Sequence, residues 1–144
     1  SKGIGKEMPL AHNLAKQLAS NLHRRAVVIY GGGILAEVAH RWKTQLNENS
    51  KAWSFHEVFP ELNHNAVVGY QFPPELADKI AVVLLRSAPL PKRLQLRYQV
   101  TSHLLERAKV GYHFADAEGS SPLSQMMSLV LFGDYVSYYL AILK

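Results

Sequence analysis

Two polar clusters interrupt a largely apolar sequence, and each holds one side chain that is able to move a proton. Residues 46–51 place Glu48 between two asparagines, and residues 61–65 place His64 between two more. A carboxylate can remove a weakly acidic proton next to a carbonyl, and an imidazole can pass on a proton near neutral pH. The two clusters therefore indicate acid–base chemistry that needs no metal and no organic cofactor.

Both residues also have an ordinary structural interpretation. A glutamate near a helix end is most often solvated, and a lone histidine is most often structural. Three features favour a base: Glu48 follows a long predicted helix, Asn47 and Asn49 can orient a carboxylate or bind sugar hydroxyls, and we expect this cluster near the carboxyl edge of a parallel sheet, where α/β folds bind ligands. Asn63 and Asn65, which flank His64, can in the same way fix its tautomer.

A third candidate is a run of three glycines between a predicted strand, residues 26–30, and a predicted helix that starts at residue 34. Free backbone N–H groups at such a turn attract anions, which favours contact with a ligand. A tight turn that needs glycine dihedral angles is the alternative. The run lacks the spacing of the dinucleotide fingerprint, and it has no Ser or Thr to make it the main phosphate site. The candidate ligand-binding residues here are Gly31, Gly32 and Gly33.

Composition narrows the class of protein. The chain has 144 residues, the size of one ordinary domain, and 48% of them are apolar, which is enough to build a core. Its formal net charge is +5, but the basic residues are scattered, which argues against nucleic-acid binding and fits small anionic partners. It has no cysteine, no metal-binding spacing of histidines, no visible signal peptide and no apolar run long enough to span a membrane. We therefore expect a cytoplasmic protein.

Short β-branched runs alternate with helical patterns along the chain. Strands are expected at residues 26–30, 52–55, 79–86 and 109–114, and helices at residues 10–23, 34–46, 94–105 and 122–143. The alternation predicts an α/β fold, with a mainly parallel sheet flanked by helices in three αβα layers. We expect residues 1–8 to be flexible and residues 9–144 to be a single domain. The last helix is apolar nearly all round, so it either fills the core or forms an interface, and Gly133 is a candidate for a break or bend.

Four segments together resemble the bifunctional phosphoglucose/phosphomannose isomerase family. They read YGGGILA at residues 30–36, RWKTQLNENSK at residues 41–51, PELNHN at residues 60–65 and GDYVSYYLA at residues 133–141. The similarity covers most of the chain, and the order and spacing of the four segments make it specific. Members of that family have two sugar isomerase (SIS) domains, and this sequence resembles the second, C-terminal one.

The resemblance implies an SIS-like fold and an aldose–ketose isomerase that interconverts glucose 6-phosphate or mannose 6-phosphate with fructose 6-phosphate. It implies that Glu48 is the base and that His64 assists opening of the sugar ring, with His64 contributed across the interface of a homodimer. The phosphorylated hexose would be held mainly by Ser/Thr loops of the first SIS domain, which is missing from this chain. Within this chain, the glycine run, Asn47, Asn49 and Asn65 are the candidate substrate-binding residues.

Three departures from the family pattern limit these expectations. The first SIS domain is absent, the sequence stops at Lys144 before a tail that carries a threonine and a lysine in the family, and Ala66 stands where the family has a glutamate. We therefore expect the 144-residue chain alone to be inactive or very weak. Two alternatives stay open: a non-catalytic SIS module that binds a phosphosugar as a sensor, and a purely structural dimerisation domain.

Overall fold

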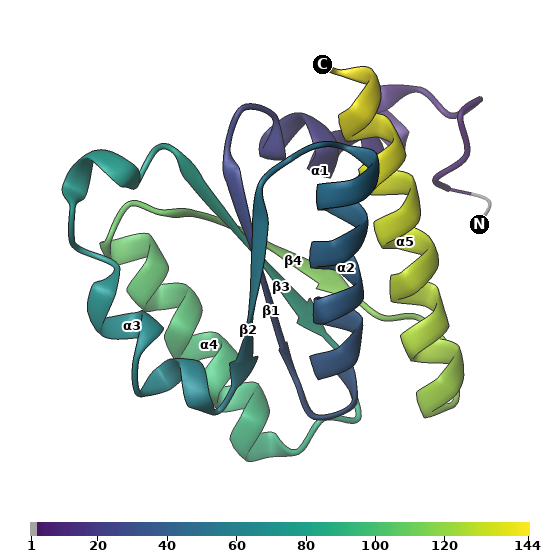
Figure 1. Cartoon of the computed structure of the whole chain (residues 1–144). Helices are drawn as coiled ribbons and strands as arrows, with labels where there is room; N and C mark the ends of the chain where they lie inside the picture. The colour runs from purple at the N-terminus through teal and green to yellow at the C-terminus, as the bar shows by residue number, and fades with distance from the viewer. Residues whose placement is uncertain (1–2) are drawn as a thin grey trace.

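Four parallel strands form the centre of the molecule, and helices cover both faces of the sheet (Figure 1). The computed structural model describes residues 3–144, apart from the side chain of Ala11. The strands lie in the order β2-β1-β3-β4, and each neighbouring pair is parallel. Their bounds are Ala26–Gly32 for β1, Ser54–Phe59 for β2, Ile80–Arg86 for β3 and Gly111–Asp116 for β4. This arrangement confirms the expected α/β fold.

The α-helices divide between the two faces of the sheet. α2 packs on β1 and β2, and α5 packs on α1 and α2, whereas α3 and α4 lie on the opposite face (Figure 1). Within residues 3–144, none of the helices is long and apolar enough to cross a membrane. The bounds are Leu14–Leu22 for α1, Ala36–Asn49 for α2, Ala66–Gly69 for α3, Lys92–Arg107 for α4 and Pro122–Ile142 for α5, with short 3-10 helices at Leu10–His12 (η1), Gly33–Leu35 (η2), Glu61–Asn63 (η3) and Pro74–Leu76 (η4).

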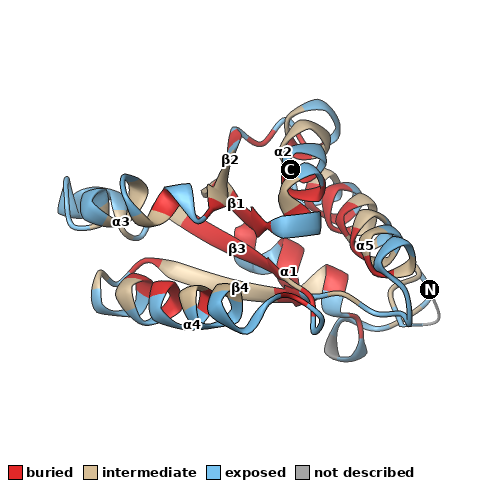
Figure 2. Cartoon of the chain, turned by 90° about the horizontal axis from the view of Figure 1, so that it is seen from below, coloured by how far each residue is buried: buried red, intermediate tan, exposed pale blue. Residues whose placement is uncertain are grey.

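The two central strands are the most deeply buried part of the sheet (Figure 2). Residues 81–85 of β3 are all buried, as expected for a parallel strand with helices on both faces. Large side chains from the helices, including Trp42 of α2 and Leu140 of α5, complete the core on one side. The sheet is therefore the buried centre of the fold. The candidate site residues lie on segments next to the amino and carboxyl ends of its strands.

The first α-helix begins later than the sequence pattern predicts. One 3-10 turn, η1, precedes it, and α1 starts at Leu14. The reason is a cap: the side chain of Asn13 accepts a hydrogen bond from the backbone N–H of Lys16 at 3.0 Å. Such a cap satisfies one of the first N–H groups of a helix and so defines where the helix begins.

Hydrogen bonds hold the N-terminal segment that precedes α1. The hydroxyl of Tyr139 in α5 donates to the carbonyl of Ile4 at 2.6 Å, and the ammonium of Lys16 donates to two further carbonyls of this segment. Residues 1–2 lie outside the described part of the chain. The flexibility that we expect for residues 1–8 stays a prediction.

Two strands begin two residues later than expected, and α2 ends later than expected. β2 and β4 each follow a lysine in the left-handed region, Lys51 with φ 51° and Lys109 with φ 60°. At these positions the chain leaves a helix and turns into the strand, as αL residues commonly do at helix ends. α2 ends at Asn49 rather than near Leu46. The asparagines of the first cluster therefore lie in the last helical turn and not beyond it.

The last helix is continuous, so the break considered at Gly133 is not present. Gly133 instead allows α5 to approach α2 closely, because a Cβ at this position would lie 2.5 Å from the ring of Trp42. One side of α5 is buried, and the other exposes a row of apolar side chains, namely Leu123, Met127, Leu131, Tyr138 and Ile142. α5 therefore contributes to the core, and an interface on its exposed side stays a prediction.

Candidate active site

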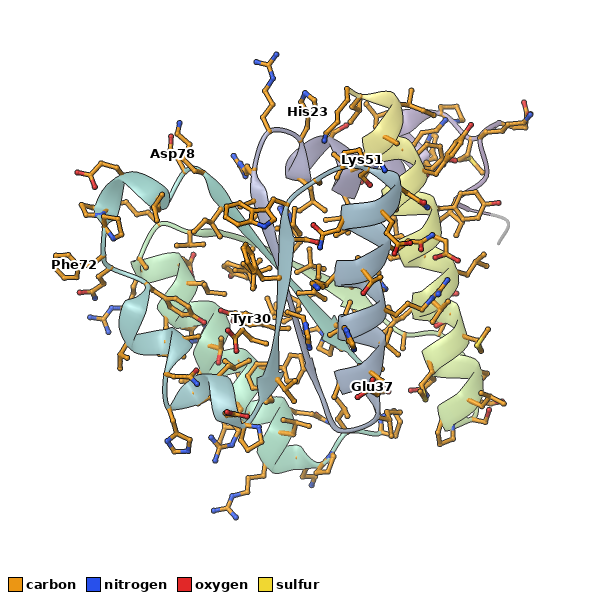
Figure 3. The ribbon with its side chains drawn as sticks, in the orientation of Figure 1. His23, Tyr30, Glu37, Lys51, Phe72 and Asp78 are labelled. Carbon is orange, nitrogen blue, oxygen red and sulfur yellow. The ribbon has the colours of Figure 1, made fainter. Side chains whose placement is uncertain are left out.

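Helix α2 carries Glu48 to the amino edge of the sheet. α2 follows β1 and runs back alongside it, so its last turn lies beside the beginning of β2. Figure 3 marks the two ends of this helix, with Glu37 near the strand arrowheads and Lys51 at the far end. The expectation that Glu48 lies near the carboxyl edge is therefore wrong, because the helix returns the chain across the height of the sheet before the cluster is reached.

Two residues of the first cluster face inward and fix the last turn of α2. The amide of Asn47 donates to the carbonyl of Ser54 at 3.1 Å and accepts from the N–H of Ser54 at 3.1 Å, which ties α2 to the start of β2. The hydroxyl of the fully buried Ser50 donates to the carbonyl of Ser137 in α5 at 2.8 Å. These contacts already use most of the hydrogen-bonding capacity of Asn47, so its expected role in substrate binding competes with a structural one.

The other two residues, Glu48 and Asn49, are exposed. Helical spacing explains this division, because successive residues point about 100° apart around a helix. The backbone carbonyl of Glu48 accepts a hydrogen bond from the ammonium of Lys51 at 2.7 Å, which satisfies one of the last carbonyls of α2 and places a positive charge nearby. Among residues 3–144 the carboxylate of Glu48 has no hydrogen-bond or ion-pair partner. It is therefore free to meet a ligand.

The second cluster lies at the opposite, carboxyl edge of the sheet. η3 follows β2 directly, and His64 ends it, with its backbone N–H bonded to the carbonyl of Glu61 at 2.9 Å. Asn65 caps α3 by accepting from the N–H of Ala66. His64 and Asn65 are both exposed, and no described residue hydrogen-bonds the imidazole ring. The contact by which Asn65 would fix the tautomer of His64 is not seen in this chain.

Glu48 and His64 therefore lie at opposite ends of β2. This strand has six residues, and a rise of about 3.3 Å per residue separates its first and last residues by about 17 Å. Two side chains so far apart in one chain cannot act together on one small molecule. The distance does not count against the expectation that a second copy of the chain supplies one of the two residues, and that expectation stays a prediction.

The glycine run is explained largely by packing within the chain. A Cβ at Gly31 would lie 2.4 Å from the carbonyl oxygen of Leu35, and one at Gly32 would lie 2.9 Å from Cβ of Phe59. Both glycines are buried, whereas Gly33 is exposed and has φ +56°, a value that favours glycine. The tight-turn interpretation therefore accounts for the run, and contact with a ligand stays a prediction, most readily at Gly33.

Two tyrosine hydroxyls attach the segment after His64 to the sheet. Tyr30 of β1 and Tyr70, next to α3, share a hydrogen bond of 2.8 Å, and Tyr30 lies at the middle of the molecule in Figure 3. Burial raises the pKa of Tyr70 to about 12, and burial also raises the pKa of Tyr30 far above its ordinary value. Both phenols are therefore protonated at neutral pH, and the pair is a neutral anchor for this segment.

Glu48 and His64 lie outside three cavities that the described residues form. Three cavities, of about 600, 910 and 210 Å³, lie beneath α4, between α1 and α5, and beneath the segment around α3, and neither residue lines any of them. Within residues 3–144, no group of three or more His, Asp or Glu side chains could hold a metal ion. The two candidate residues thus lie on exposed surfaces of the described chain.

Comparison with known protein families identifies the family of this chain. The model of the bacterial phospho-glucose isomerase C-terminal SIS domain matches residues 11–144, which is nearly the whole sequence. The chain belongs to this family. The segments that suggested the resemblance lie within the matched range, and the SIS domain has the α/β architecture described above.

Curated relatives of this SIS domain are longer proteins. It is 39% identical over 138 residues to the bifunctional phosphoglucose/phosphomannose isomerase of Caldicellulosiruptor bescii, covering 95% of this chain and 41% of that protein. It is 35% identical over 126 residues to the protein of the same name from Aquifex aeolicus, covering 88% of this chain and 39% of that one. The chain therefore spans about 40% of the length of the relatives it matches.

A solved structure supports the fold. A glucose-6-phosphate isomerase-like protein from Thermus thermophilus superposes with a TM-score of 0.75 over 99% of this chain and 45% of its own, at 23% sequence identity. At this level of identity the likeness establishes the architecture and not the chemistry.

Sequence reasoning gave Asn63, like Asn65, only a role in fixing the tautomer of His64, and it did not predict the contacts of Asn63 with α4. Its side chain bonds to Thr101 and Arg97 of α4, more than 30 residues away in the sequence. A polar residue next to a candidate histidine was the only local signal. Its partners become apparent only when α4 is seen to pack beside η3.

Proposed function

We propose that this SIS domain supplies the base and the ring-opening residue of an isomerase that interconverts glucose 6-phosphate or mannose 6-phosphate with fructose 6-phosphate. The proposal rests on the different surroundings of the residues in the first cluster, some of which are buried and hydrogen-bonded while Glu48 is exposed. Asn47 and Ser50 hold the end of α2 firmly, and Glu48 is exposed to solvent without a side-chain partner in the described part of the chain. A fixed backbone with a free carboxylate is what a general base requires.

In this mechanism Glu48 removes the proton from the carbon next to the sugar carbonyl. The electron pair of that C–H bond forms an enediolate. The carboxyl, which can exchange its proton with solvent, then returns a proton to the former carbonyl carbon. His64 acts earlier, as the cyclic sugar opens: it passes a proton to the ring oxygen while the bond from that oxygen to the anomeric carbon breaks, and the anomeric hydroxyl gives up its proton to become the carbonyl. The chemistry is a proton transfer between two carbons and two oxygens, so this chain's residues need to bind, orient and exchange protons only.

The separation of Glu48 and His64 supports a site made by two copies of the chain. The two residues flank β2 at its opposite ends. A two-fold axis that sets two copies with their β2 strands antiparallel pairs the beginning of one strand with the end of the other. The carboxylate of one subunit then approaches the imidazole of its partner, and a homodimer has two equivalent sites.

The rest of the protein is proposed to hold the phosphate. This chain offers no Ser/Thr loop at its glycine turn, and it spans about 40% of the length of its relatives. A first SIS domain with such loops would supply the missing contacts, and the isolated chain would be inactive or very weak. We place the full-length protein in the cytoplasm, in keeping with a sugar-phosphate substrate.

A sensor that binds a phosphosugar without turnover is the second candidate function. It shares the fold, but it has no use for an exposed and unpartnered carboxylate on a fixed turn. Calorimetric titration with fructose 6-phosphate, together with a turnover assay, separates the possibilities. A sensor releases heat on binding without turnover, and a purely structural domain gives neither.

The test of Glu48 compares two glutamates of the same helix in the full-length protein. Glu48→Gln removes the base and keeps the size of the side chain, so kcat for fructose 6-phosphate should fall by about 10²–10⁴-fold. Glu37→Gln, at the other end of α2 on an exposed turn, is the matched control and should leave kcat within about twofold. Near-normal turnover by Glu48→Gln would remove Glu48 from the mechanism.

The role of His64 is tested with two kinds of substrate. A six-carbon sugar phosphate is mostly cyclic, whereas a four-carbon aldose 4-phosphate cannot close a ring because its fourth oxygen carries the phosphate. His64→Gln should therefore slow the six-carbon reaction and spare the four-carbon one, while Glu48→Gln slows both. Equal losses on the two substrates would contradict a ring-opening role for His64.

A further inference from the structure

The position of His64 depends on very few contacts of its own. It is exposed, no described residue hydrogen-bonds its ring, and its backbone is held by one N–H bond to the carbonyl of Glu61. The neighbouring Leu62 is completely buried, so the chain emerges from the core one residue before Asn63. Whatever fixes Asn63 therefore decides where the imidazole of His64 points.

Asn63 is attached to α4 through both ends of its side-chain amide. Its Nδ2 donates to Oγ1 of Thr101 at 2.9 Å, and its Oδ1 accepts from Nη1 of Arg97 at 3.3 Å. Thr101 is completely buried, and it lies one helical turn from Arg97 on the same side of α4. Two bonds to one rigid helix hold the amide in a single orientation, which neither bond alone would do.

We propose that Asn63 is the positioning residue for His64, and that its hydrogen bonds to Thr101 and Arg97 set the direction in which the imidazole is presented to the site of the partner subunit. The proposal rests on the proposed function of His64. Asn63 does not touch the substrate, and it acts by holding the backbone of the next residue. A displacement of about 1 Å in a reacting group can lower a rate by about 10²-fold, so such a support affects turnover strongly.

A merely structural Asn63 would behave differently. Its loss would lower stability and the yield of folded protein, but its effect on kcat per folded enzyme would be the same with or without His64. A positioning residue has no effect on turnover once the group that it positions is gone. A double-mutant cycle therefore distinguishes the two roles, because it measures whether two substitutions act through one another.

The experiment uses the full-length protein in four forms: wild type, Asn63→Ala, His64→Gln and the double variant. We expect Asn63→Ala to lower kcat for fructose 6-phosphate by about tenfold in the wild-type background. In the His64→Gln background it should change kcat by less than about twofold. The four-carbon aldose 4-phosphate, which needs no ring opening, should be converted at an unchanged rate by Asn63→Ala.

Two further variants keep the test decisive if Asn63→Ala folds poorly. Asn63→Asp retains oxygen acceptors for both partners, because the Thr101 hydroxyl can donate as well as accept, so turnover should be close to that of wild type. Thr101→Val removes the hydrogen bond between Asn63 and Thr101 with little change of side-chain volume. It should reproduce part of the loss of kcat that Asn63→Ala causes.

Equal losses of kcat from Asn63→Ala in both backgrounds would overturn the proposal, as would a loss of the same size on the four-carbon substrate. Failure of the underlying function gives a separate result: His64→Gln alone would then convert fructose 6-phosphate at the wild-type rate. Failure of the role of Asn63 is therefore measured with Asn63→Ala, and failure of the role of His64 is measured with His64→Gln alone.

Discussion

At the scale of single residues, the two asparagines beside Glu48 have opposite surroundings. Asn47 makes three hydrogen bonds, to the carbonyl of Lys43 and to both backbone groups of Ser54, whereas Asn49 is exposed. A substitution of Asn47 should therefore change stability, and a substitution of Asn49 should change only function. The family motif contains both, so a motif alone does not separate the two roles.

Asn47→Ala should lower the free energy of unfolding by about 1–3 kcal/mol, because it leaves the polar backbone groups at the start of β2 without partners. Asn49→Ala is the matched control and should stay within about 0.5 kcal/mol of wild type. Chemical denaturation of the two variants measures the difference. Similar stability losses for both would show that the hydrogen bonds of Asn47 do not secure the end of α2.

The sequence pointed to Glu48 and His64 through residue type and neighbours, and the structure shows both to be exposed and without side-chain partners among the described residues. The prediction from the sequence placed Glu48 at the wrong edge of the sheet. That error followed from ending α2 near residue 46 and from associating the cluster with the strand ends, whereas the helix continues to the opposite edge. Whether these two residues carry the chemistry stays a prediction.

At the scale of elements, the contact between α2 and α5 depends on a glycine. Gly133 is buried, and a Cβ there would lie 2.5 Å from the indole of Trp42, whose Nε1 donates to the carbonyl of Leu129 at 2.8 Å. The indole is thus held by a hydrogen bond as well as by packing, and it cannot move aside easily. This contact also positions α2, whose last turn carries Glu48.

Gly133→Ala should therefore lower the free energy of unfolding by about 1–3 kcal/mol through overpacking. Gly69→Ala is a control of opposite sign: nothing lies within 4 Å of a Cβ there, so reduced freedom of the unfolded chain should raise stability by about 0.4–1 kcal/mol. Thermal unfolding followed by circular dichroism compares the two. A neutral Gly133→Ala would mean that α2 and α5 can separate without loss.

The order of strands and helices was predictable because buried strands give short apolar runs that are distinct from helical periodicity. The exact ends were not. β2 and β4 begin after Lys51 and Lys109, whose left-handed conformations depend on how the preceding helix meets the sheet. The start of α1 depended on capping by Asn13, which competed with a plausible earlier start at Pro9.

At the scale of the whole molecule, the proposed site requires two copies of the chain, since about 17 Å of β2 lies between Glu48 and His64. If His64 of one subunit serves Glu48 of the other, two inactive variants can restore one site between them. In a heterodimer of Glu48→Gln and His64→Gln, one site carries both substitutions and the other carries neither.

The purified heterodimer of these full-length variants, isolated with two affinity tags, should therefore have about half the activity of the wild-type dimer. The two parent homodimers serve as controls and should be nearly inactive on fructose 6-phosphate. If both residues acted within one subunit, each site of the heterodimer would contain one defect, and its activity would stay as low as that of the parents.

The most direct test of the central claim follows the proton itself. When the full-length protein converts fructose 6-phosphate in heavy water, a carboxylate base should exchange the abstracted proton with solvent, so that NMR detects deuterium on the carbon next to the new carbonyl. Glu48→Gln should lower the rate of this incorporation by about 10²-fold or more, while Glu37→Gln leaves it unchanged. Undiminished incorporation by Glu48→Gln would contradict the assignment of Glu48 as the base.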